Sequence, residues 1–422
     1  MDFSTRSKLS IMMFLQFFIW GSWNVTMGTY LLNIGFDAIS VGASYSTMNW
    51  GAIFAPVIVG MLADRFFPAQ KVMAILHLMG AAILWWISSI SDPAVFFWTL
   101  FAYALCYMPT LALANSVSFN QMDDPGKQFP GIRVMGTLGW IAVGLIIGVM
   151  VPSLSGNSIE ATNVPLRIGA ASSLVMGIYC FFLPDTPPSN VGRKPSLAEV
   201  LGLETLSLMK DRSFAVFIIG SLLISIPLTF YYNFANAFLN ETGMENAAGK
   251  MTMGQMSEVI FLVLIPFFFV RLGVKKMLLV GMAAWILRYV MFAFGDNDNL
   301  VLMLYLGIIL HGVCFDFFFV TGQIYVDRFA PANIRSSAQG FIHVATYGVG
   351  MVIGSWASGA IVDNYVIAGS NLHDWNTIWL IPAGMAFIVM VGFMLFFREP
   401  ATEQTPATPT ETPMGDSYDT PR

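Results

Sequence analysis

FPGIRVMGTLGW, residues 129–140, is the stretch around which the chain is organised. It places Arg133 at the start of a run that is otherwise apolar to Val151, and a run of that length predicts a membrane-spanning helix. A charge inside such a helix costs about 2.5–3.5 kcal/mol even by the lower scales, so it is seldom without a role. Arg133, Thr137 and Trp140 lie at i, i+4 and i+7 and share one helical face, which suits a polar ligand with a flat ring. The alternative is that Arg133 lies near the helix end and extends its charge to the membrane surface.

The composition indicates a membrane protein. Of 422 residues, 56% are hydrophobic and only 11% are charged, whereas a soluble protein carries about 25% charged residues. No basic stripe indicates a nucleic-acid partner. Cys106, Cys180 and Cys314 are far apart in apolar runs, so we expect buried thiols and neither a disulfide nor a metal site. We expect no cofactor.

Apolar runs separated by Gly, Pro, Asn and Asp predict twelve spans in two sets of six. The predicted spans are 9–30, 41–63, 70–90, 95–119, 131–151, 164–184, 213–239, 252–271, 275–295, 299–325, 335–362 and 375–397. The longest polar connection separates the sets. The predicted organisation is a first bundle at 1–184, a linker at 185–212, a second bundle at 213–398, and a disordered Thr/Pro/Glu-rich tail at 399–422.

The basic residues orient these spans. With the N-terminus inside, the outer segments hold only Lys250 and Arg167, and Arg133 and Arg288 lie within spans. The other Lys and Arg residues all fall inside, a strong positive-inside bias that predicts cytoplasmic termini. They are Arg6, Lys8, Arg65, Lys71, Lys127, Arg193, Lys194, Lys210, Arg212, Arg271, Lys275, Lys276, Arg328, Arg335, Arg398 and Arg422.

Two six-span halves joined by a cytoplasmic loop resemble the major facilitator superfamily. The segment from Gly60 to Asp64 and Arg65 resembles the G-x-x-x-D-R motif of that superfamily, which acts in conformational gating. The small residue allows helices to approach closely, and the carboxylate accepts from a helix N-terminus or an arginine. The alternative is an ordinary charged turn that only maintains topology.

Four charged residues lie well inside predicted spans: Arg133, Glu258, Arg288 and Asp316. Two ion pairs that only tie helices together would account for them, although buried pairs are weak evidence for stability. Gln255, at i−3 from Glu258, gives that helix face a second polar group. We expect Arg288, which has no polar neighbour of its own, to pair with a carboxylate.

The tenth span separates two kinds of site. Asp316 lies among four phenylalanines, a setting suited to a carboxyl group that takes and releases a proton. His311 lies one turn before Phe315 and shares its face, so this pair is predicted to face a ligand while Asp316 points elsewhere. A hydrogen-bonded packing role for His311 is the alternative, and His343 has no role beyond helix contact.

The seventh span carries Thr229, Tyr232 and Asn236 after Pro227, which can bend a membrane helix. Tyr232 and Asn236, at i and i+4, favour a cavity over an interfacial aromatic belt.

Taken jointly, several stretches resemble the bacterial nucleoside:proton symporters, a family of the major facilitator superfamily. They cover nearly all of the chain except the tail: FLQFFIWGSW (14–23), YMPTLALANSVSF (107–119), FPGIRVMGTLGW (129–140), LGLETLSLMK (201–210), GQMSEVIFLVLIPFF (254–268), MAAWILRYVMFAFGD (282–296), CFDFF (314–318) and SSAQG (336–340).

The resemblance implies a substrate cavity built from both halves. It assigns Arg133, Thr137, Gln255, Glu258 and Phe315 to the substrate. A carboxylate and an amide can hold ribose hydroxyls, and an aromatic ring can stack on a base.

The same resemblance implies that Asp316 and Glu258 couple transport to protons. Well-known members have an amide-bearing pair where this chain has Thr229 and Tyr232, a tyrosine at His311 and a phenylalanine at Trp140. These four positions contact base or sugar in the family, so the base-selecting set is altered here.

The predicted function is therefore import of nucleosides by proton symport through alternating access, in a bacterial inner membrane. The alternative is proton-coupled transport of another polar solute, such as a sugar or glycoside. An enzyme is not expected, because catalytic motifs such as H-E-x-x-H and G-x-S-x-G are absent from the sequence. The expected partners are the small-molecule substrate, protons and the lipid bilayer, with the carrier as a monomer.

Overall fold

The computed structural model describes residues 1–422 except 63–66, 189–202, 332–333 and 399–422. Across those described ranges the regular structure is helical, and the sole β feature is an isolated bridge between Val366 and His373. This confirms the all-α prediction. Within the same ranges, nine helices are long and apolar enough to cross a membrane, judged by length and composition.

Several helices of the first part of the chain begin after aspartates that cap them. Asp92 accepts from the backbone N–H of Val95 at 2.9 Å, and Asp124 accepts from that of Lys127 at 3.3 Å; a proline follows each cap. The elements are α1 (Phe3–Asn24), α2 (Met27–Asn33), α3 (Ala38–Leu62), α4 (Ala69–Ile87), α5 (Pro93–Asn120), α6 (Pro125–Leu145), η1 (Ile146–Met150), α7 (Val151–Ser155), α8 (Val164–Tyr179) and η2 (Cys180–Phe182).

The second part repeats this chemistry, with Asp211 and Asp374 capping α10 and α17. Its elements are η3 (Leu203–Lys210), α10 (Arg212–Glu241), α11 (Ala247–Phe294), α12 (Val301–Ile309), α13 (His311–Phe315), η4 (Asp316–Val320), α14 (Thr321–Phe329), α15 (Arg335–His343), η5 (Val344–Gly350), α16 (Met351–Asn364) and α17 (Trp375–Phe396). The segments η1, η4 and η5 are π-helical turns inside longer helices.

The 48-residue helix α11 is broken at Gly273, whose φ of 68° and ψ of 177° suit only glycine. Ile265 and Met277, on either side of the break, pack in one cluster with Phe317. The two arms of α11 are therefore antiparallel, and the break falls between the predicted spans 252–271 and 275–295.

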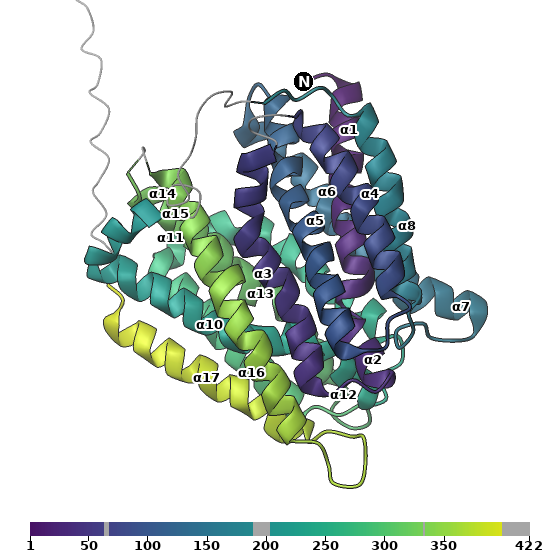
Figure 1. The fold of residues 1–422 in the computed structure, drawn as a ribbon. Helices are drawn as coiled ribbons and strands as arrows, with labels where there is room; N and C mark the ends of the chain where they lie inside the picture. The colour runs from purple at the N-terminus through teal and green to yellow at the C-terminus, as the bar shows by residue number, and fades with distance from the viewer. Residues whose placement is uncertain (63–66, 189–202, 332–333, 399–422) are drawn as a thin grey trace, which may run out of the picture.

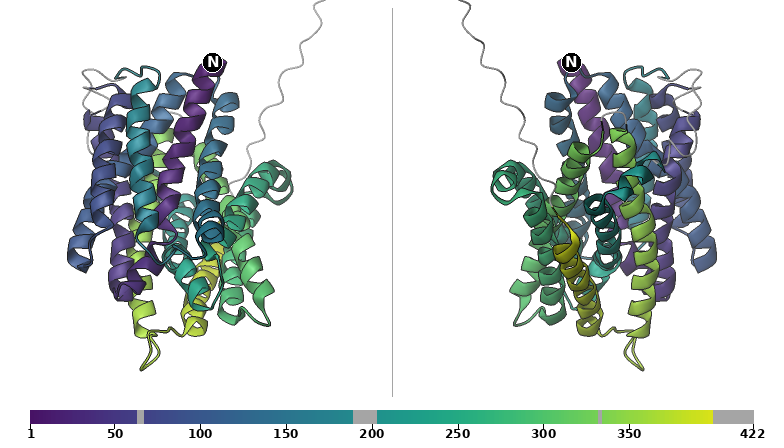
Figure 2. Two further views of the ribbon diagram at one scale, coloured as in Figure 1. Left: turned by 90° about the vertical axis from the view of Figure 1, so that its right-hand side faces the viewer. Right: turned by 90° about the vertical axis from the view of Figure 1, so that its left-hand side faces the viewer.

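The molecule divides into two groups of helices that lie side by side. In Figure 1, α1, α4, α5, α6 and α8 form one group, and α10, α11 and α14 to α17 form the other. Between them α3 packs against α16, α2 against α10, and α6 against α11. Figure 2 shows that the helices run roughly along one common direction, as in a membrane bundle.

Contacts between the groups gather at the end of the molecule away from the N-terminus, where α2 lies in Figure 1. Here a Cβ atom added to Gly148 would overlap the backbone of Gly249, so main chain meets main chain. Small residues allow such close helix approach in membrane proteins. This end of the molecule is closed.

Three predictions concern residues that the structure leaves out. Gly60 is helical in α3, but Asp64 and Arg65 of the proposed motif lie outside the described residues. The central part of the predicted linker, 189–202, and the tail, 399–422, also lie outside them.

Candidate functional site

The polar stripe of α6 rests on aromatic side chains of α1. The Arg133 guanidinium lies over the Phe17 ring, 4.3 Å from its centroid, and Trp140 meets Trp20 edge to face at 5.7 Å. Phe17 and Trp20 are one turn apart on α1, so together they support the face that carries Arg133, Thr137 and Trp140. The guanidinium is therefore held by a cation–π contact at a defined place on the bundle.

Glu258 of α11 faces this stripe from the other group of helices. Arg133 and Glu258 attract each other electrostatically, yet within the described parts of the chain they form no ion pair at 4.0 Å or less. Tyr347 in η5 lies close enough to interact electrostatically with both Arg133 and Glu258. Two opposite charges thus face each other across the interface with space between them.

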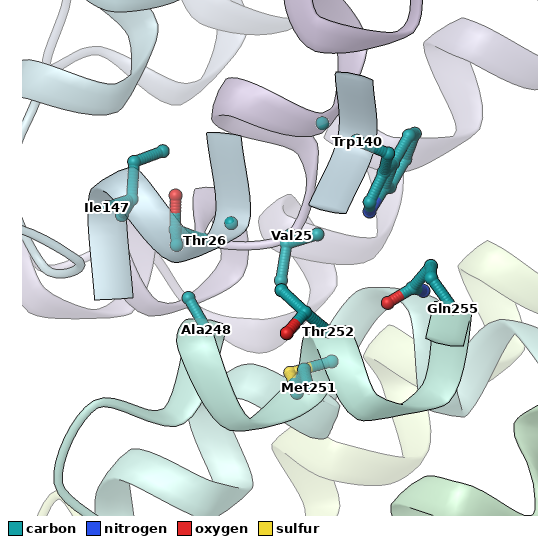
Figure 3. Close-up of a pocket in the computed structure, with 10 residues that line it drawn as sticks. Val25, Thr26, Trp140, Ile147, Ala248, Met251, Thr252 and Gln255 are labelled. Atoms are coloured by element: carbon teal, nitrogen blue, oxygen red, sulfur yellow. The ribbon is translucent and has the colours of Figure 1, made fainter. Parts of the chain in front are cut away.

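A small pocket lies between the two groups of helices. Arg133 and Glu258 do not line it, but Gln255, one turn before Glu258 on α11, does. Trp140 contributes from α6 and Gln255 from α11, and Figure 3 shows both at the same pocket as Val25 and Thr252. Its volume is about 20 Å³, which is room for a water molecule, whereas ligand pockets occupy about 300–1,000 Å³. In this conformation the volume of this pocket is too small to hold a nucleoside.

The helix that carries His311 is held against α11 by two hydrogen bonds. The Ser257 hydroxyl donates to the Ile309 carbonyl at 2.7 Å and accepts from the Gly312 N–H at 3.0 Å. A Cβ atom on Gly312 would lie 2.5 Å from the Ser257 carbonyl carbon, so the close approach requires glycine. It brings His311 Nε2 to 3.8 Å from Glu258 Oε2.

Aromatic rings surround His311, which is 4% exposed. Tyr231 stacks on it with ring centroids 5.4 Å apart, Tyr232 meets it edge to face at 6.3 Å, and Phe315 lies at 5.9 Å. Its Nδ1 has no partner among the described residues. The structure therefore brings His311, Phe315 and Tyr232 together with Glu258.

Asp316 begins the π-helical turn η4, a local widening that is frequent at functional sites. The residue is 1% exposed, and neither carboxyl oxygen has a hydrogen-bond partner within the described ranges. Glu258 lies close enough to repel it electrostatically. An unpartnered buried carboxyl group is costly, which is consistent with a role in binding a proton.

Arg288 does not pair with a carboxylate in the described structure, so that prediction is wrong. It is fully buried, its Nε donates to the Gly307 carbonyl at 3.0 Å, and its guanidinium lies 4.0 Å from the centroid of the Tyr231 ring. Because Tyr231 in turn stacks on His311, Arg288 supports the aromatic surroundings of that histidine.

Two residues of the seventh predicted span lie elsewhere. The Thr229 hydroxyl donates to the Ile226 carbonyl at 2.7 Å and packs against Gly354 of α16. Asn236 is hydrogen-bonded at the closed end of the molecule, to Thr29 and Glu160.

Phe17 and Tyr347 are contacts that the sequence analysis missed. Tyr347 stacks on His343 at 4.8 Å and touches Phe319 at 5.3 Å, which gives His343 a supporting role. The i, i+4 spacing of His343 and Tyr347 was a visible signal for this pair. Phe17 carried no such signal, because phenylalanine is common throughout this chain.

The chain resembles known transporters along almost its whole length. A family model described as nucleoside H⁺ symporter matches residues 3–402. The putative nucleoside transporter YegT of Escherichia coli is 44% identical, covering 95% of this chain and 96% of that protein. The xanthosine permease of E. coli is 35% identical, covering 94% and 96% respectively.

A solved structure agrees with this. The crystal structure of the nucleoside transporter NupG superimposes with a TM-score of 0.85 at 34% identity, covering 95% of this chain and 100% of that one. The match confirms the expected major facilitator fold and the multi-pass membrane character. Family model, relatives and fold agree that the chain belongs to the nucleoside H⁺ symporter family of membrane transporters.

Proposed function

We propose that the protein imports nucleosides into a bacterial cell by proton symport through alternating access. The observation that carries the proposal is the electrostatic interaction of Arg133 and Glu258 from opposite groups of helices, together with a pocket between the same groups that Trp140 and Gln255 line. A site made by both halves is the arrangement in which rocking one half against the other exposes substrate to each side in turn.

The proposed carrier has twelve spans in two bundles, 1–184 and 213–398, joined by the linker 185–212, with both termini and the tail 399–422 in the cytoplasm. Support comes from counting the two arms of α11 as separate spans and adding α1 and α3 to the apolar helices. The positive-inside bias of the loops supports the orientation. The bacterial relatives favour the inner membrane, and we propose a monomer.

In the proposed substrate site, Gln255 and Glu258 hold the ribose hydroxyls, with Arg133 and Thr137 facing them from α6. Trp140, Tyr232, His311 and Phe315 surround the base. Thr229, also predicted to bind substrate, is left out of the proposed site because its side chain is buried against Gly354 of α16. The xanthosine permease among the relatives makes purine nucleosides a reasonable part of the substrate range.

Asp316 and Glu258 are the proposed proton carriers. A nucleoside is neutral, so the membrane potential and the pH gradient act on it only through a group that is protonated on one side and deprotonated on the other. The two repelling carboxyl groups are suited to this, because a proton on one of them removes the repulsion.

Uptake by proteoliposomes with an imposed pH gradient, acidic outside, tests the proposal. The protein should accumulate uridine or a purine nucleoside above the outside concentration, and a protonophore should abolish the accumulation. Asp316→Asn should lose uphill accumulation and keep nucleoside exchange. Accumulation by Asp316→Asn would remove Asp316 from the coupling role. Uptake of free ribose or glucosides in place of nucleosides would favour the alternative substrate class.

A further inference from the structure

A second buried carboxylate lies at the closed end of the molecule, and Ala248, which binds it, also lines the pocket between the halves. Glu160 belongs to the connection between α7 and α8 and is 1% exposed. Its Oε2 accepts from Asn236 Nδ2 at 2.8 Å and from Asn240 Nδ2 at 3.0 Å, both on α10. Both of its oxygens lie 3.1 Å from the backbone nitrogen of Ala248, in the first turn of α11.

Every partner of this carboxylate is a donor, so the surroundings fit the ionised group. Two amide groups and a helix N-terminus, with its favourable dipole, replace the water that an exposed carboxylate would bind. Among the described residues no Lys or Arg forms an ion pair with Glu160. The Thr29 hydroxyl donates to Asn236 Oδ1, which fixes the orientation of that amide.

These contacts cross the boundary between the two halves. Glu160 and Thr29 come from the first half, and Asn236, Asn240 and Ala248 come from the second. Nearby, the backbones of Gly148 and Gly249 are in direct contact, which a side chain at position 148 would prevent. Opening this end would separate Glu160 from all of its donors at once.

We propose that the ionised Glu160 is the latch that keeps the outer side of the carrier shut, and that its release to water is a step of each transport cycle. The inference rests on the proposed function, which makes the closed end the outer side. Glu160 thereby stabilises the inward-open state relative to the outward-open state, and the size of its contribution sets how often the outer side opens.

A side-specific labelling experiment tests this. Thr252 lines the pocket between the halves, so a Thr252→Cys reporter becomes reachable from outside only when the outer end opens. The native cysteines Cys106, Cys180 and Cys314 are buried. In intact cells, a membrane-impermeant maleimide should label the reporter about tenfold faster when Glu160→Gln is also present, which corresponds to about 1.4 kcal/mol in the opening equilibrium.

Glu241→Gln is the matched control. Glu241 is a partly buried glutamate of the second half, and its partner His373 belongs to the same half, at 2.8 Å between Oε2 and Nδ1. Its replacement should leave the labelling rate of the reporter unchanged. If Glu160→Gln does not reach the membrane, Asn240→Ala removes one donor from the same carboxylate and should accelerate labelling about threefold, a smaller shift of the same equilibrium.

The outcomes separate the latch from the transport function. Equal labelling in the parent, Glu160→Gln and Asn240→Ala would overturn the latch, whatever the uptake of nucleosides. Faster labelling in Glu241→Gln as well would show that the effect is not specific to Glu160, and would overturn the latch. If labelling follows the predicted order but nucleosides neither protect the reporter nor enter proteoliposomes, the latch stands and the proposed substrate falls.

Discussion

Trp140 stands at the edge of the pocket with its ring held by Trp20, so its place is set by α1 as much as by its own helix. A preformed aromatic wall can stack on a base without the entropy loss of ordering a free side chain. Such stacking contributes about 1–3 kcal/mol per base in nucleic-acid sites.

Trp140→Ala should therefore raise the KM for nucleoside uptake about tenfold, while Trp140→Phe should raise it less than about threefold. Initial uptake rates in proteoliposomes, measured across nucleoside concentrations, give both values. Trp98→Ala is the control, because Trp98 is 65% exposed on α5. An unchanged KM for Trp140→Ala would exclude stacking on this ring.

Arg288 is fully buried and stacked over Tyr231, so lysine cannot replace its flat guanidinium. We expect Arg288→Lys to destabilise the purified protein by about 1–2 kcal/mol, the size of a desolvated cation–π contact. Thermal unfolding in detergent measures this. In the control, Arg271→Lys, the guanidinium lies 3.6 Å from the Phe267 ring centroid at an exposed site, so the change should be small. Equal changes in both variants would argue against the buried contact.

The charged members of the site could be predicted from the sequence, whereas most of their partners could not. Arg133, Glu258 and Asp316 stand out because a charge in an apolar run is rare. Phe17 and Tyr231 do not stand out, since 14% of the chain is aromatic. Which ring meets which charge depends on the register between helices that are distant in sequence, and Arg288 was misassigned for this reason.

The pairing of α13 with α11 determines the distance between His311 and Glu258. Gly312→Ala would place a methyl group against the Ser257 backbone, which cannot move aside as a side chain can. We expect transport to fall at least about tenfold with the protein still inserted, because overpacking by about 1–3 kcal/mol pushes α13 outward. Uptake normalised to the amount of protein in the membrane checks this.

Gly384→Ala is the matched control for that change. A Cβ on Gly384 of α17 meets nothing within 4 Å, so alanine there should be tolerated or slightly stabilising. Normal transport by Gly312→Ala would show that α13 can move away from α11 without loss of function.

The helices themselves could be predicted more readily than their irregularities. The predicted spans 95–119, 213–239 and 375–397 match α5, α10 and α17 to within two residues at each end, whereas the predicted span 131–151 differs from α6 by six residues. The π-helical turn at Asp316 has no local sequence signature, because one extra residue in a turn is stabilised by tertiary packing. The same holds for the break between α12 and α13.

The proposed topology of the whole chain predicts which connections face the cytoplasm. Alkaline phosphatase fused after Glu245, in the connection between α10 and α11, should be about 10-fold more active than the same enzyme fused after Lys210, because one span separates these sites. Green fluorescent protein fused after Arg398 should fluoresce, since that end is proposed to be inside. Active phosphatase after Lys210 would invert the orientation or change the number of spans.

The hydropathy pattern does not predict which end of the molecule is closed. Glu160 lies in a short polar connection and looks like an ordinary loop residue in the sequence. Its importance follows from the arrangement of both halves, because its donors come from α10 and α11.

The break at Gly273 has a consequence for how the protein is made. The two arms of α11 are joined by a single non-helical residue, and the charges at the turn, Arg271, Lys275 and Lys276, lie within the ends of the arms themselves. The short turn therefore favours insertion of the two arms as a single hairpin, with these basic residues left on the side that the positive-inside rule makes cytoplasmic. Any other residue at this position would be strained in the finished fold and would also obstruct the reversal on which co-insertion of the arms depends.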